Sequence, residues 1–159
     1  MRPAIDYLAA LVLAAVFVVA AGAKIARAGN TATAFATLGV PRPAAVARLV
    51  PGAELAVAVL LIAVPRAGGV AGLVLLATFT VFLLRALRSG VEAPCRCFGG
   101  VREAPISAAD VWRNAMLAVL AVAATGTTEP HAPSVPAFAL VAAAVTAGFA
   151  ALRLARGHG

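Results

Sequence analysis

The chain contains little charge. Only 12% of its 159 residues are Asp, Glu, Lys or Arg, whereas 63% are hydrophobic. Soluble domains carry about twice that charged fraction, so the composition excludes an ordinary soluble enzyme or binding module. A mean hydropathy of +1.00 predicts an integral membrane protein instead. Nearly every residue is needed for spans or short connections, which predicts one domain without a separate soluble module.

Acidic residues are especially scarce. Six Asp and Glu oppose thirteen Lys and Arg, which gives a formal net charge of +7. A basic chain can bind nucleic acid, but these basic residues stand singly at the ends of apolar runs and form no tract interleaved with aromatics. They are therefore predicted to face anionic membrane lipid, and no nucleic-acid partner is expected.

Cysteine is nearly absent, since Cys95 and Cys97 are the only two in the chain. Two thiols cannot complete a tetrahedral metal site, and His131 and His158 lie far away in the sequence, so no metal site is expected within one chain. A pair one residue apart suits reversible disulfide formation, soft-metal binding or receipt of a partner's sulfur. The pair is predicted to carry the chemistry.

The residues around the two cysteines favour reactivity. Arg96 lies between them, and its charge favours the thiolate form of both. A bridge between positions i and i+2 is tight, because an extended chain places the two Cα atoms near the upper limit of about 6.8 Å. Pro94 and the Phe98-Gly99-Gly100 turn supply the bend that such a bridge needs. A strained bridge of this kind suits exchange better than structural cross-linking.

The uncharged runs predict an all-α, polytopic fold. A helix rises about 1.5 Å per residue and must cross roughly 30 Å of hydrocarbon, so each span needs about 20 residues. Four such helices are expected to form a bundle, and a fifth, C-terminal helix follows a Pro-rich connection. The predicted spans are 7–23, 44–64, 67–84, 108–125 and 135–152.

Two spans have short apolar parts, and each begins with charged residues. Glu54 and Arg113 are therefore expected to lie at or inside the membrane boundary. Alternating spans place both on the face that holds the cysteines, which predicts an ion pair in a polar pocket beneath the cysteine loop. Such a pair could serve function or only fix helix packing. Lys24, Arg85 and Arg88 lie on the same face and are expected to extend to the headgroups.

Five short motifs occur in a characteristic order: F-V-V-A-A-G-A-K in the first span, L-G-V-P-R-P after it, P-G-A-E-L in the second, C-R-C-F-G after the third and W-R-N-A in the fourth. This order resembles the MauE branch of the MauE/DoxX membrane protein family over about residues 10–125. The resemblance implies a DoxX-like four-helix membrane domain at 1–127, with the C-x-C-F-G loop at 95–99. The Pro-rich connection and additional helix occupy 128–159.

The resemblance also implies a function. MauE proteins are associated with methylamine utilisation and are needed to mature the disulfide-rich small subunit of methylamine dehydrogenase, where they are thought to form or transfer disulfides. Transferred to this chain, the redox pair is Cys95 and Cys97, supported by their neighbours in the C-x-C-F-G motif. The matching polar positions are Lys24, Glu54, Arg113 and Asn114.

These observations predict a membrane thiol-disulfide oxidoreductase or redox maturation factor. Without a third cysteine, the electrons need a quinone in the pocket near Glu54 and Arg113, or a thioredoxin-like or disulfide-containing protein partner. Two alternatives remain open. One is a soft-metal protein that binds Cu(I) or zinc with a partner's ligands. The other is a non-catalytic membrane assembly subunit.

Charge also predicts orientation in a bacterial cytoplasmic membrane. Arg2 and Arg66 lie on one face, and all other Lys and Arg residues lie on the face of the cysteines. The positive-inside rule therefore places Cys95 and Cys97 on the cytoplasmic side. Disulfide formation in exported proteins would require the opposite side, so this orientation favours exchange with a cytoplasmic thiol system.

Overall fold

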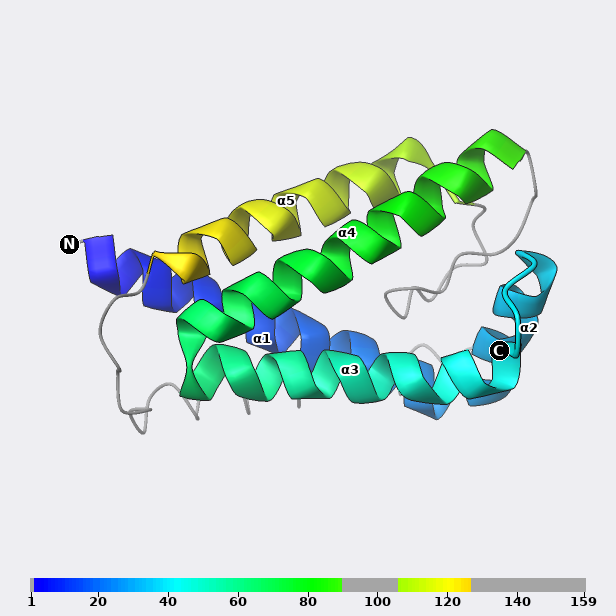
Figure 1. Ribbon diagram of the computed structural model, residues 1–159, viewed down its shortest axis with the longest axis horizontal. Coiled ribbons are helices and arrows are strands. Elements are labelled where there is room, and N and C mark those ends of the chain that lie inside the picture. The colour runs from blue at the N-terminus through cyan, green and yellow to red at the C-terminus, as the bar shows by residue number, and fades with distance from the viewer. Residues whose placement is uncertain (1, 90–105, 127–159) are drawn as a thin grey trace, which may run out of the picture.

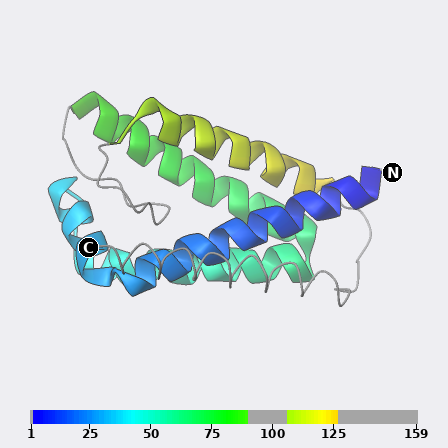
Figure 2. The ribbon, with the colours of Figure 1, turned by 180° about the vertical axis from the view of Figure 1, so that it is seen from behind.

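The computed structural model describes residues 2–89 and 106–126, and this part of the chain is helical without strands (Figure 1). Four long helices lie side by side as an antiparallel bundle, and one short helix lies at one end of it (Figures 1 and 2). The helices are α1 (Arg2–Ala26), α2 (Ala28–Thr37), α3 (Pro43–Ala63), α4 (Pro65–Ser89) and α5 (Ala108–Thr125).

The predicted all-α membrane fold is confirmed. Each of the first four predicted spans coincides with a helix that is long and apolar enough to cross a membrane, namely Ile5–Ala26, Pro43–Ala63, Pro65–Arg88 and Ala108–Thr125. The expected fifth span at 135–152 lies outside the described residues. The helix α2 was not predicted.

The long helices form a four-cornered bundle. α1 packs against α3 and α5, and α4 packs against the same two helices, so α1 and α4 face each other along a diagonal. The ends of α1 and α4 and the starts of α3 and α5 lie at the end of the bundle where α2 lies, here called the α2 end (Figure 1). The predicted sharing of one face by these helix ends is confirmed.

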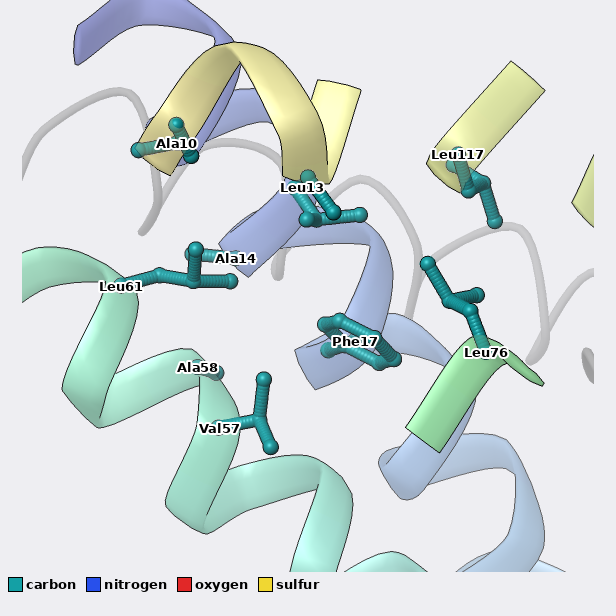
Figure 3. Packing of buried hydrophobic residues seen from close by; sticks show 11 residues of the cluster. Ala10, Leu13, Ala14, Phe17, Val57, Ala58, Leu61, Leu76 and Leu117 are labelled. Atoms are coloured by element: carbon teal, nitrogen blue, oxygen red, sulfur yellow. The ribbon is translucent and has the colours of Figure 1, made fainter. Parts of the chain in front are cut away.

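The core is built mainly from small and aliphatic side chains around one aromatic ring. Phe17 of α1 is fully buried at its centre. Alanines let the helices approach closely, which is typical of packing in a membrane, where lipid is as apolar as the core itself. Figure 3 shows the ring among its neighbours Ala10, Leu13, Ala14, Val57, Ala58, Leu61, Leu76 and Leu117.

Local signals explain where two helices begin. Pro43 occupies the first turn of α3, where its missing N–H costs nothing. At α5, Ser107 and Asp110 form a capping box, in which the Ser107 backbone N–H donates to Asp110 Oδ2 at 2.9 Å. This cap fixes the first turn of α5 beside the last turns of α4.

The short helix α2 is attached to α4 by an aromatic contact. Arg27 adopts a non-helical conformation between α1 and α2, so the chain changes direction there. Phe35 is buried and meets Phe82 of α4 edge-on, with ring centroids 5.8 Å apart. Thr31, Thr33 and Thr37 donate their hydroxyls to carbonyls one turn earlier in the same region. The three threonine hydroxyls are thereby satisfied without a partner outside this region.

The glycines near the start of α4 allow this helix to lie close to α3 and α5. Only Val64 separates α3 from α4, and a Cβ on Gly68 would overlap the backbone of Leu61. A Cβ on Gly69 would lie 2.8 Å from the carbonyl oxygen of Ala121 in α5. Gly72 is less crowded, because a Cβ there would lie 3.6 Å from side-chain atoms of Leu13 and Phe17 in α1 and 3.7 Å from Val57 in α3.

We expect Gly68→Ala to destabilise the bundle by about 1–3 kcal/mol, the usual cost of overpacking. The added methyl meets helix backbone, which cannot move aside as a flexible side chain would. Gly52→Ala is the matched control, because nothing lies within 4 Å of its Cβ position in α3. The control should be neutral or slightly stabilising in the same detergent unfolding experiment, and equal stability of both variants would contradict the prediction.

Candidate functional site

A buried ion pair joins α1 to α3. Lys24, in the last turn of α1, donates from Nζ to Glu54 Oε1 over 2.7 Å, and the two side chains are 1% and 0% exposed. Lys24 Nζ also lies 5.7 Å from the ring centroid of Phe79 in α4, within the range of a cation-π contact. Charged groups inside a membrane normally pair in this way, because the bilayer cannot solvate them.

The predicted ion pair between Glu54 and Arg113 is wrong. Arg113 donates to Asp110 Oδ1 at 2.8 Å, and its side chain is 47% exposed. Asp110 lies one helical turn earlier in α5, so it can neutralise the guanidinium locally at the surface. Glu54 instead uses Lys24, and the polar pocket expected between Glu54 and Arg113 is not formed.

The expectation that Lys24 extends to the headgroups is also wrong. α2 begins directly after Arg27 and packs against α3, and on the last turn of α1 the side chain of Lys24 is buried whereas that of Ile25 is exposed. Lys24 therefore pairs with Glu54 inside the bundle and does not extend to the headgroups. Arg85 and Arg88 are exposed near the end of α4, and their extension to the headgroups stays a prediction.

A second polar contact joins α5 to α4. Asn114 is fully buried, and its Nδ2 donates to the carbonyl oxygen of Leu76 at 2.8 Å and to Thr80 Oγ1 at 2.6 Å. Thr80 Oγ1 donates in turn to the Leu76 carbonyl at 2.8 Å. This small network takes the place of hydrophobic packing at one level of the α4–α5 contact.

The two contacts meet at adjacent positions of α4, because Phe79 faces Lys24 and Thr80 faces Asn114. We call Lys24, Glu54, Phe79, Thr80 and Asn114 the polar layer, since together they involve all four long helices. Two of its buried oxygens, Glu54 Oε2 and Asn114 Oδ1, accept no hydrogen bond from the described residues. The layer can therefore accept further hydrogen bonds, but it brings together no nucleophile and no acid-base pair beyond Lys24 and Glu54.

Sequence reasoning identified three members of the polar layer and missed two. Lys24, Glu54 and Asn114 came from the family resemblance. Phe79 and Thr80 were not singled out, because an aromatic or threonine residue within a long apolar run resembles ordinary span composition. The spacing of Leu76 and Thr80 by one helical turn is the available signal for a side chain that bridges to the backbone.

The predicted redox residues Cys95 and Cys97, with Arg96, Phe98 and Gly99, lie outside the described residues. The structure does place both ends of their connection. The chain leaves α4 at Ser89 and returns at Ile106, which is buried against Leu83 and Ala86 at the α2 end. Within residues 2–89 and 106–126, no three His, Cys, Asp or Glu side chains gather as a metal site would require.

Four apolar spans around a buried ion pair define this chain as a multi-pass membrane protein. Residues 2–127 match the family described as methylamine utilisation protein MauE, and the chain belongs to that family. The predicted resemblance is thereby confirmed. No curated protein and no solved structure matches the chain.

Proposed function

We propose that this membrane protein of the MauE family exchanges disulfides with a partner through Cys95 and Cys97, as an oxidoreductase or as a redox maturation factor. The observation that carries the proposal is the position of the chain's only cysteines, in a connection that begins after Ser89 at the end of α4 and ends at Ile106, which packs against Leu83 and Ala86 at the α2 end. We expect a thiol pair in such a connection to meet a partner protein while the bundle anchors both ends of the connection.

In the proposed reaction, a thiolate of a reduced partner attacks one sulfur of the Cys95–Cys97 bond. That bond breaks and a mixed disulfide forms. The partner's second thiol then attacks its own sulfur in the mixed disulfide, so the partner leaves oxidised and both cysteines become thiols. Two electrons and two protons have moved to this chain. They pass on either to a quinone or to the disulfide of a thioredoxin-like protein, which restores the Cys95–Cys97 bond.

The polar layer would support this reaction by holding the bundle together, not by chemistry. Lys24 and Glu54 fix α1 to α3, and Asn114 fixes α5 to α4, the two helices that flank the cysteine connection. The quinone site expected near Glu54 and Arg113 has no counterpart, since Arg113 faces outward beside Asp110. A quinone acceptor would therefore need other residues.

A redox titration of the purified protein tests the proposal. We expect the two thiols to titrate as one reversible two-electron couple when glutathione ratios are varied and free thiols are alkylated. Stoichiometric binding of Cu(I) or zinc without such a couple would indicate the metal-binding alternative. Absence of both would indicate a non-catalytic assembly subunit.

We further propose that the cysteine connection faces the cytoplasm. The ends of α1 and α4 and the start of α3 place Arg27, Arg42, Arg48, Arg85 and Arg88 toward the α2 end, whereas Arg66 is at the opposite end, where α4 begins. The positive-inside rule orients a chain with this charge distribution. We expect a membrane-impermeant maleimide to label the cysteines only after cells are permeabilised. Labelling of intact cells would reverse the orientation and favour a reaction with exported partners.

A further inference from the structure

A cavity of about 460 Å³ opens at the α2 end, apart from the polar layer. One wall is the turn that joins α2 to α3, and the other is the last part of the α4 span. This volume lies within the range of about 300–1,000 Å³ that is typical of small-molecule sites. The lining residues are Thr37, Leu38, Gly39, Val40, Pro41, Phe82, Arg85 and Ala86.

The walls of the cavity are preformed. The turn contains Gly39 at φ 71°, in the left-handed region that ends a helix sharply, and Arg42 at φ 52°, which is the N-cap of α3. Backbone N–H groups of Gly39 and Val40 donate to carbonyls of α2, at 3.0 and 2.9 Å. On the other wall, the edge-on contact with Phe35 holds the ring of Phe82.

Among the described residues that line the cavity, Arg85 provides the only charged side chain. Its guanidinium makes no hydrogen bond or ion pair with any part of the chain that the structure describes. The other lining side chains are apolar apart from Thr37, whose hydroxyl already donates to the carbonyl of Thr33. The cavity thus combines one unpaired cation with a hydrocarbon-like wall.

We propose that this cavity binds the phosphate headgroup of an anionic phospholipid. A guanidinium pairs with phosphate through two parallel hydrogen bonds, and Arg85 lies near the end of the Pro65–Arg88 span, at the depth where headgroups begin. The glycerol and upper acyl chain then lie against Leu38, Val40 and Phe82. Arg42 and Arg88 lie at the same end and form no ion pair with residues 2–89 or 106–126, and their charge favours an anionic lipid over a zwitterionic one.

An acidic peptide is a weaker match to these features. A peptide brings backbone polar groups that need hydrogen-bond partners, whereas the cavity offers apolar walls and one free cation. A lipid meets the apolar walls with hydrocarbon and the cation with phosphate. The proposal is independent of the thiol chemistry, so its failure would leave the proposed function unaffected.

Native mass spectrometry of the full chain in detergent tests the proposal, with phosphatidylglycerol and phosphatidylcholine as probes. We expect one phosphatidylglycerol to be retained in preference to phosphatidylcholine. Arg85→Gln should weaken this binding about tenfold, because it removes a charge-assisted hydrogen bond. Val40→Trp, which fills the cavity without changing its charge, should weaken binding similarly. Arg88→Gln is the matched control, since Arg88 lies one turn further along α4 and does not line the cavity.

Several results would overturn the proposal. Equal losses in Arg85→Gln and Arg88→Gln would mean that lipid responds to the overall surface charge. Unchanged binding in Val40→Trp would place the lipid outside the cavity. Displacement of the lipid by inorganic phosphate would identify the free anion as the ligand, and retention of an acidic peptide in place of the lipid would identify a protein partner.

Discussion

Replacing Glu54 by Gln is expected to destabilise the bundle by about 3–5 kcal/mol, because it leaves the Lys24 ammonium buried without a counter-charge. Lys24 and Glu54 are 1% and 0% exposed, so neither can turn to water without opening the contact between α1 and α3. Lys24→Met should be similarly destabilising through the carboxylate that it leaves behind. The free energy of unfolding in mixed detergent micelles measures both effects.

Two comparisons make this result specific. The exposed ion pair between Arg113 and Asp110 is the matched control. Arg113→Gln should change the free energy of unfolding by less than about 1 kcal/mol, because this pair is solvent-accessible. The double variant Lys24→Met/Glu54→Leu should recover most of the loss, since apolar residues of similar volume can replace a buried ion pair. Equal, small effects of Glu54→Gln and Arg113→Gln would disprove the energetic importance of the buried pair.

The second large effect is expected at the cysteines. If Cys95 and Cys97 exchange disulfides, one of the single variants Cys95→Ser and Cys97→Ser should accumulate a covalent adduct with its partner. In that variant the surviving thiol still attacks the disulfide of an oxidised, thioredoxin-like partner, whereas the second cysteine that would resolve the resulting mixed disulfide is absent. Non-reducing electrophoresis of membranes, followed by mass spectrometry of the adduct, detects the trapped complex and identifies the partner.

The double variant Cys95→Ser/Cys97→Ser is the control. It should form no adduct, yet insert and fold as the wild type does, because a bridge between positions i and i+2 closes too small a loop to stabilise the fold appreciably. Arg96→Glu should slow alkylation of the thiols at neutral pH, since a negative neighbour raises the pKa of each thiol. If no adduct forms in either single variant, the assembly-subunit function becomes the better account.

The bundle was predictable because hydrocarbon imposes a strict requirement on the sequence. Every span needs about 20 residues with few charges, and such runs are visible without any knowledge of packing. The short helix α2 was not predicted because its sequence, AGNTATAFAT, is too short for a span, contains one large apolar residue, and interrupts its alanines with Gly, Asn and Thr, which are poor helix formers. Tertiary contacts such as Phe35 against Phe82 stabilise it, and composition does not reveal them.

The polar layer was predictable in part. Charge within short spans correctly indicated that Glu54 is buried, and the family resemblance indicated Lys24 and Asn114. The partner of Glu54 was mistaken because Lys24 sits near the end of an apolar run, where a lysine usually reaches the headgroups. Only the packing of the helices shows that the Lys24 side chain is on the buried side of this last turn, next to Glu54 of α3.

The ion pair between α1 and α3 has a consequence for how the chain enters the membrane. A lone charge within a span costs about 2.5–3.5 kcal/mol on insertion scales, and Glu54 lies in the middle of α3. During synthesis, α1 emerges first and carries Lys24, so the ammonium is already in place when α3 follows. We therefore expect α3 to insert poorly when it is produced alone and efficiently when α1 precedes it, which couples the order of synthesis to membrane integration.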